Sequence, residues 1–251
     1  YFPSVHVDIA VNPDSSISVS EKRTFSFDGS FTQIYWDIPV KSDQQIENVS
    51  VSEGSIPYNL IPYEDVSRPA QNYWVRRLGN SYHIEAYHSS VNTDKEFILS
   101  YKLTNAVMRY SDVAELYWKV IGEEWGSKTD SVKILVTLPK EVPTKDIYVW
   151  GHGPLNGSSK ILNGTTAEFS VSDVPPQAFV ELRMLFPSSI ITTGPIDNVP
   201  HLAAVLKEEK AFQDRTILKE RLRLGALIGG VVVLIGWIIF WYLIWYKYGR
   251  E

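Results

Sequence analysis

The sequence predicts an all-β head, built from two tandem immunoglobulin-like β-sandwich units, followed by a long α-helix that includes one transmembrane span. Three observations predict this organisation. Apolar and polar residues alternate with a period of two through the first hundred residues, a similar order of segments recurs in the second hundred, and an uncharged stretch of 23 residues lies near the C-terminus. Period-two alternation is typical of half-buried strands, whereas an apolar stretch of that length is typical of a membrane span.

The first strands are predicted from this alternation and from the turn residues that interrupt it. Val5, Val7, Ile9 and Val11 share one face, residues 12–16 (NPDSS) form a turn, and residues 17–27 return the chain. Asn, Pro, Asp and Ser favour turns, so this segment is predicted to be an antiparallel hairpin. Further strands are predicted at residues 32–38, 46–51, 82–87 and 97–103.

The second half of the head repeats the order of these segments. A strand that ends in Leu138-Pro139 corresponds to one that ends in Ile38-Pro39, and strand-like segments follow at residues 147–149, 166–171 and 179–183. We therefore predict two β-sandwich units, at residues 1–103 and 104–187. The alternative is that two runs of strands and loops align in this way by chance.

The C-terminal quarter is predicted to be a linker and a continuous helix. Residues 188–199 are rich in Pro, Gly, Ser and Thr and read as a linker, and residues 200–223 form a charged stalk helix. Residues 224–246 form the span, because 23 residues at 1.5 Å each cover about 34 Å and a bilayer core is about 30 Å thick. Residues 247–251 form a short basic end with Lys247 and Arg250. If stalk and span form one helix, it is about 70 Å long.

Composition narrows the function classes. The formal net charge of −5 argues against a nucleic-acid partner, and the absence of cysteine excludes disulfides and thiolate chemistry. The chain begins with Tyr1, so we expect a signal peptide to have been removed and the head to lie outside the cytoplasm. Five basic residues before the span favour the opposite orientation, but acidic residues alternate with them. We predict a single-pass protein of the bacterial plasma membrane with an extracytoplasmic head.

The span carries two candidate features. Gly225, Ala226, Gly229 and Gly230 have the small-residue spacing that allows two membrane helices to approach closely. Aromatic and basic residues at the other end are predicted to lie at the membrane interface: Trp241, Tyr242, Trp245, Tyr246 and Lys247.

The head shows no pattern of catalytic residues. It contains no nucleophile elbow, phosphate loop or calcium loop, and no pair of histidines has the spacing of a zinc site on a helix. We predict no catalytic residue, no metal and no cofactor, and hence no enzyme. One segment joins acidic and aromatic residues without alternation, and it is the candidate interaction surface: Asp112, Glu115, Trp118, Glu123, Glu124 and Trp125. A sugar-binding or sugar-processing head is the alternative, and it predicts that Trp74, Trp118 or Trp125 is exposed beside a carboxylate.

Several segments resemble the YciQ-like family of bacterial membrane proteins, a domain of unknown function. They are DSSISVSE at residues 14–21, FILSY at 97–101, DVAELYW at 112–118 with Ile121, Gly122 and Trp125, and VELR at 180–183. The resemblance implies an extracytoplasmic β-rich head followed by membrane helices, and LemA-type membrane proteins as candidate partners. Relatives of this kind continue into further membrane helices. The sequence ends at Glu251, so we expect either that the protein is shorter than these relatives or that the remaining helices follow this residue. The predicted function is a membrane-anchored scaffold of an envelope assembly, as a homo- or hetero-oligomer in the bilayer.

Overall fold

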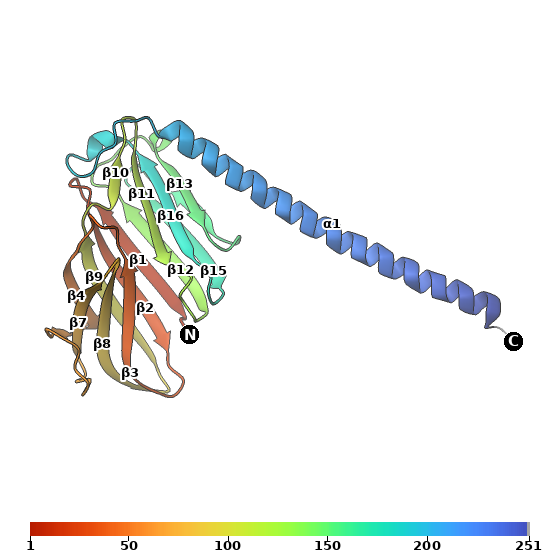
Figure 1. Cartoon of the computed structure of the whole chain (residues 1–251), viewed down its shortest axis with the longest axis horizontal. Helices are drawn as coiled ribbons and strands as arrows, with labels where there is room; N and C mark the ends of the chain where they lie inside the picture. The colour runs from red at the N-terminus through yellow and green to blue at the C-terminus, as the bar shows by residue number, and fades with distance from the viewer. Residues whose placement is uncertain (250–251) are drawn as a thin grey trace. The chain divides into compact units, whose positions relative to one another are not determined.

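One large β-sheet runs through both halves of the head (Figure 1). The computed structural model describes residues 1–249, apart from the side chain of Glu220. Arg250 and Glu251, part of the predicted basic end, lie outside the described residues. In spatial order the large sheet contains β14 (Ser158–Ile161), β15 (Thr166–Val174), β12 (Thr129–Thr137), β1 (Ser4–Val11), β2 (Ile17–Ser26), β9 (Asp94–Leu103), β4 (Ile46–Glu53) and β5 (Ile56–Pro57).

Two smaller sheets, one from each half of the chain, complete the head. The first contains β3 (Ser30–Pro39), β8 (Ser81–Val91), β7 (Asn72–Leu78) and β6 (Asn59–Leu60). The second contains β10 (Val107–Arg109), β11 (Ala114–Ile121), β16 (Val180–Phe186) and β13 (Tyr148–His152). A single cluster of buried apolar residues includes members of all three sheets. The side of each sheet that faces this cluster is called its inner face below, and the opposite side its outer face.

The predicted N-terminal hairpin is present. β1 and β2 pair antiparallel from Ser4↔Thr24 to Val11↔Ile17. The turn between them places Ser15 at a φ of 66°, and the Asp14 carboxylate accepts a hydrogen bond from the backbone N–H of Ser16. Alternating burial along both strands puts their apolar residues on the inner face.

The two halves of the chain meet in a parallel pair of strands. β1 pairs with β12 from Val5↔Val132 to Ala10↔Thr137. Strands that precede residue 104 form the first small sheet and five strands of the large one, and later strands form the second small sheet and the remaining three. Because the large sheet is continuous across this pair, the halves share one hydrogen-bonded layer. The division at residue 104 into two sandwich units stays a prediction.

Strand β7 is not visible as alternation in the sequence. Its residues Tyr73 and Trp74 are consecutive and both buried, which breaks the period of two. Tyr73 belongs to the core, where its hydroxyl donates to the carbonyl oxygen of Val49 at 2.7 Å. Trp74 lies opposite Glu85 on the outer face. The period-two pattern arises when one face of a strand is buried and the other is exposed to solvent. Because β7 is buried on both faces at this point, its sequence does not show that pattern.

An ion pair lies inside the head, on the inner face of β2. Glu21 and Arg23 are 4% and 6% exposed, and the Arg23 Nε donates to a Glu21 carboxylate oxygen. The Arg23 guanidinium lies 4.0 Å from the ring centroid of Trp125 and 5.9 Å from that of Trp36. Trp36 belongs to the first small sheet and Trp125 follows β11 of the second, so Arg23 contacts side chains from both halves.

The segment predicted as a linker is packed onto the head. Residues 188–197, here called the strap, include η2 (Ser188–Ile190) and cross the β1–β2 turn. The Thr192 N–H donates to the Pro13 carbonyl at 2.7 Å, and the Ser15 hydroxyl donates to the Thr193 carbonyl at 2.5 Å. Ile191 is 2% exposed. The strap is therefore held by specific hydrogen bonds and by apolar burial.

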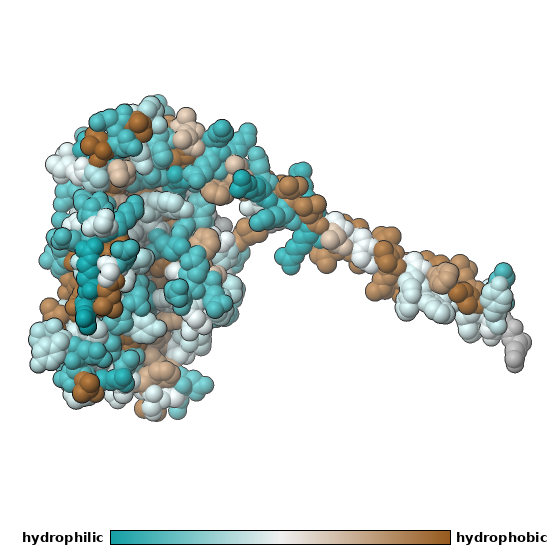
Figure 2. Space-filling model, viewed as in Figure 1, coloured by the Kyte–Doolittle hydropathy of each residue, from teal (hydrophilic) through white to brown (hydrophobic). Residues whose placement is uncertain are grey.

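The predicted stalk and span form one helix, α1 (Leu202–Tyr248), of 47 residues. At 1.5 Å per residue its length is about 70 Å. Within residues 1–249 it is the helix that is long and apolar enough to cross a membrane, and none of its most apolar window is buried. Figure 2 shows brown and white residues along the part of the helix nearer the C-terminus. The head Tyr1–His201 and this helix are separate compact units.

Candidate functional site

The outer face of the second small sheet carries an unusual set of aromatic and charged side chains. Along β11, Leu116 and Val120 are core residues, so Glu115, Tyr117 and Lys119 point to the outer face. Arg183 of β16 lies directly opposite Tyr117, and Glu181 lies opposite Lys119. Strand order and register thus bring together residues that are more than sixty positions apart in the sequence.

One end of this outer face is closed. The Arg183 Nε donates to Glu115 Oε1 at 2.6 Å, and both residues are buried. Tyr110 donates to Glu115 Oε2 at 3.4 Å, and its ring stacks on that of His201 with centroids 3.9 Å apart. Burial and the Glu115 carboxylate raise the pKa of the Tyr110 hydroxyl. These contacts fix Glu115 in a structural role.

The other end is open. Tyr117 is 49% exposed, and its hydroxyl donates to Glu181 Oε2 at 3.0 Å. The Lys119 ammonium pairs with Glu181 Oε1 at 3.2 Å and with Glu123 Oε2 at 3.1 Å. Partial burial opposes the charge of Lys119, but hydrogen bonds with the two carboxylates outweigh it and raise the pKa of the amine. Lys119 therefore stays protonated, and the carboxylates of Glu123 and Glu181 hold it in place and balance its positive charge.

The edge strand β13 extends this open end with a row of rings. Tyr148, Trp150 and His152 lie opposite Leu185, Arg183 and Glu181, hence on the same outer face. The rings of Tyr148 and Trp150 are parallel to within 8°, with centroids 6.1 Å apart. We call the open end the docking face and define it by one set of residues: Tyr117, Lys119, Trp150, His152 and Glu181.

The structure divides the predicted interaction surface. Glu115 is buried against Arg183, and Asp112 is exposed and accepts a hydrogen bond from the His201 N–H at 2.8 Å. Trp118 and Trp125 pack against the core instead of joining the acidic residues. Glu123 reaches the docking face through Lys119, and Glu124 is exposed in the following turn. No local signal in the sequence places Trp150, His152 or Glu181 at this surface, because their position depends on the pairing of β11 with β16 and of β16 with β13.

The three tryptophans of the sugar-binding alternative do not form a platform. Trp74 is 6% exposed, although it lies opposite Glu85. Trp118 and Trp125 are half-buried and contact the core, and the face of Trp125 is occupied by Arg23. A ring that stacks on a sugar needs an open face, and burial of Trp74 and the contact of Arg23 with Trp125 oppose this in two of the three.

The residues predicted to act in the membrane lie along α1. A Cβ atom built at Gly225, Gly229 or Gly230 would meet nothing within 4 Å, so this side of the helix is open. Ala226 lies between them. The predicted interface residues Trp241, Tyr242, Trp245 and Tyr246 are each at least half exposed, and Lys247 is in the last turn. Both sets are available for contact, and their roles stay predictions.

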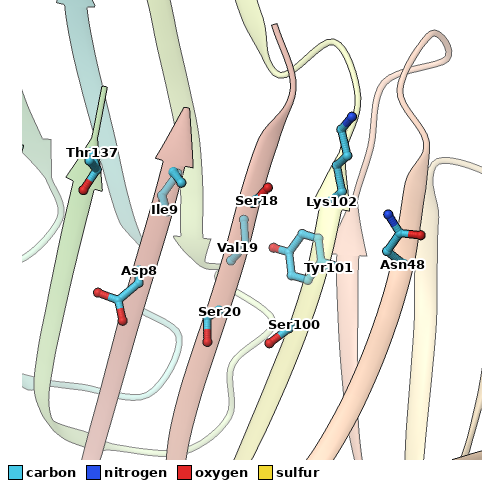
Figure 3. Close-up of a pocket in the computed structure, with 11 residues that line it drawn as sticks. Asp8, Ile9, Ser18, Val19, Ser20, Asn48, Ser100, Tyr101, Lys102 and Thr137 are labelled. Carbon is cyan, nitrogen blue, oxygen red and sulfur yellow. The ribbon is translucent and has the colours of Figure 1, made fainter. Parts of the chain in front are cut away.

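The outer face of the large sheet contains a groove of about 480 Å³ (Figure 3). It crosses β12, β1, β2, β9 and β4 and is lined mainly by short side chains. Asp8, Ser20 and Ser100 lie side by side on β1, β2 and β9, and Lys102 and Asn48 stand at one end. Within residues 1–249, no cluster of three or more histidine, aspartate or glutamate side chains could hold a metal ion.

Comparison with known proteins identifies one family. The family model described as "Predicted membrane protein (DUF2207) N-terminal domain" matches residues 1–186. No curated protein matches the sequence.

Several solved structures are similar in part. One, from Parabacteroides distasonis and provisionally described as a protease, is 8% identical, with a TM-score of 0.43 over 74% of this chain and 40% of that one. An M1 zinc metallopeptidase from Deinococcus radiodurans is 10% identical, with a TM-score of 0.38 over 71% and 40% of the two chains. A protein from Legionella pneumophila, provisionally described as nutrient-binding, is 11% identical, with a TM-score of 0.45 over 73% and 66%. The chain thus matches only 40% of the length of the first two, and likeness at these scores supports no inference about function.

Proposed function

Because the chain belongs to the DUF2207 family of predicted membrane proteins, we propose that it is a single-pass interaction module whose head docks another membrane protein. The head is proposed to lie outside the cytoplasm of a bacterial cell, as two immunoglobulin-like units on a semi-rigid helix. LemA-type membrane proteins remain the predicted class of partner. The helix α1, with its unburied apolar window, supports the membrane part of this proposal.

The observation that carries the docking role is the composition of the docking face. Tyrosine and tryptophan, with an arginine beside them, are the residues that most often dominate binding energy at protein interfaces. Here Tyr117 and Trp150 are held in position by neighbours: the guanidinium of Arg183 lies 5.2 Å from the Tyr117 ring centroid, and Tyr148 stacks beside Trp150. Side chains that are already ordered lose little entropy on binding, which favours a preformed interface.

A photo-crosslinking residue placed at Tyr117 tests this docking role. We expect one discrete crosslinked species between the full-length protein and a second membrane protein in native membranes. Trp150→Ala should reduce its yield about tenfold or more, as expected for loss of an aromatic residue at the centre of an interface. The readout is the gel-shifted species, identified by mass spectrometry.

The matched control places the same crosslinker at Tyr35. This tyrosine is 59% exposed on a strand of the first small sheet, so it samples a different face. The docking role is wrong if Tyr35 gives the same species with equal yield, or if Trp150→Ala leaves the yield at Tyr117 unchanged.

Association of the spans is the second part of the proposal. Replacing Gly225 and Gly229 with leucine should lower the recovery of the assembly from mild detergent, because bulky side chains keep the two helix backbones apart. Size-exclusion chromatography with light scattering measures the change. The control is the double substitution Val231→Leu and Ile235→Leu on another side of α1. Equal recovery of the glycine variant and the control would remove the helix contact from the proposal.

A further inference from the structure

The groove on the outer face of the large sheet is built from two adjacent rows of short side chains. Strand register sets these rows: one runs Thr137–Ala10–Ser18–Lys102, and the next runs Asp8–Ser20–Ser100. Neighbouring strands are about 4.8 Å apart, so the rows present a polar group or a small apolar group at that interval across the sheet.

Longer side chains bound the groove. The next row along the strands contains Lys133, His6 and Lys22. At one end, β4 has a register irregularity between Glu47 and Ser50, where Asn48 takes a φ of 54° and lines the groove. A bulge of this kind re-aims a side chain, and here it places an amide at the rim.

The groove offers hydrogen-bonding groups, and its one lining cation, Lys102, is already paired. Within the described part of the chain, the hydroxyls of Ser20 and Ser100 have no partner. The Asp8 Oδ1 atom lies 3.3 Å from His6 Nε2, and the Lys102 ammonium is paired with the Asp14 carboxylate at 2.9 Å. A hydrogen bond with Asp14 raises the pKa of Lys102, so this amine stays charged and remains paired with the Asp14 carboxylate.

This combination favours a polar ligand that carries no negative charge. An anionic ligand would need a cation that is not already paired, and a purely apolar ligand would bury the serine hydroxyls without partners, which costs free energy. A hydroxyl is one donor and two acceptors, so rows of serines match a ligand rich in hydroxyl or amide groups. The groove is shallow and largely open to solvent, so it suits an extended ligand that lies across the strands.

We infer that this groove binds a segment of an uncharged glycan, laid across the strands and held by the serine rows and Asn48. This inference goes beyond the proposed docking role and uses the opposite side of the head's core from the docking face. Tyr101, the aromatic residue among the lining positions, belongs to the core and is 5% exposed. Without an open ring for stacking, the affinity should be modest, with a Kd of about 1 mM.

Site-specific thiol protection tests the inference on the full-length protein in lipid nanodiscs. Because the chain has no cysteine, Ser20→Cys or Ser100→Cys introduces a unique thiol in the groove. We expect tetra-N-acetylchitotetraose, an uncharged oligosaccharide, to slow alkylation by a maleimide about tenfold at ten times its Kd, by mass action. The anionic tetramer of galacturonic acid should leave the rate unchanged.

Ser131→Cys is the matched control, because Ser131 is an exposed serine on the outer face of β12 outside the groove. Its alkylation should be independent of both sugars. No slowing at Ser20 and Ser100, equal slowing at Ser131, or equal slowing by the anionic sugar would each overturn the inference. Adding Ser20→Leu to the Ser100→Cys variant should abolish protection, and retained protection would also count against the groove. Crosslinking at Tyr117 does not depend on any of these outcomes, so the two proposals fail separately.

Discussion

Replacing Arg23 with alanine is expected to lower the free energy of unfolding of the head by about 3–5 kcal/mol. The substitution leaves the Glu21 carboxylate, which is 4% exposed, without its cation in the core. It also removes the guanidinium from the face of Trp125 and opens space between the two halves. Urea unfolding of the full-length protein in detergent, followed by tryptophan fluorescence, measures the loss, because Trp36 and Trp125 adjoin the site.

The neighbouring Lys22 provides the control. It is on the same strand but on the outer face, where it pairs with Glu96 at 3.4 Å and about half of its side chain is exposed. Lys22→Ala should cost less than about 1 kcal/mol, as is usual for exposed ion pairs.

The double variant Glu21→Leu, Arg23→Met separates the two contributions to the loss. It should recover much of the stability lost in Arg23→Ala, because apolar side chains of similar volume can replace a buried pair. A loss in Arg23→Ala no larger than that in Lys22→Ala would contradict the buried ion pair.

Replacing Gly194 with alanine is expected to cost about 2–4 kcal/mol and to release the strap. Gly194 has a φ of 109°, which is strained for any residue with a Cβ atom. The new Cβ atom would also lie closer than van der Waals contact to two atoms of Ser15, its hydroxyl oxygen and its own Cβ. Ser15 cannot move away easily, because it is fully buried in the β1–β2 turn and bonded to Thr193. Unfolding measurements and faster proteolysis within residues 188–197 report the effect.

Gly79→Ala separates backbone strain from crowding. Gly79 has a φ of 59°, yet a Cβ there would meet nothing within 4 Å. Its substitution should therefore cost only the backbone strain of the left-handed region, about 1–2 kcal/mol. Combining Gly194→Ala with Ser15→Gly should recover part of the loss by removing the collision. If Gly194→Ala and Gly79→Ala are equally destabilising, the strap is not packed against the turn as described.

The residues of the candidate site could be predicted from the sequence only in part. The mixture of acids and aromatics in segment 112–125 predicts an interaction surface, and this segment contributes Tyr117 and Lys119 to the docking face, with Glu123 paired to Lys119. However, Glu115 and Trp118, three residues apart in an extended strand, face opposite sides of the sheet. Trp150 and Glu181 join the face only because β13 and β16 pair beside β11.

The sequence by itself determined the elements whose signals are local. Period-two alternation located the strands with one wet face, the Asn12–Ser16 turn located the hairpin, and the uncharged stretch after Arg223 located the apolar part of α1. Tertiary structure alone decided the parallel pairing of β1 with β12, the inward position of Glu21 and Arg23, and the packing of the strap. The long-range partners in these features are about 100 to 180 residues apart. The choice of such partners follows from the total burial and hydrogen bonding of the whole head, which no local period encodes.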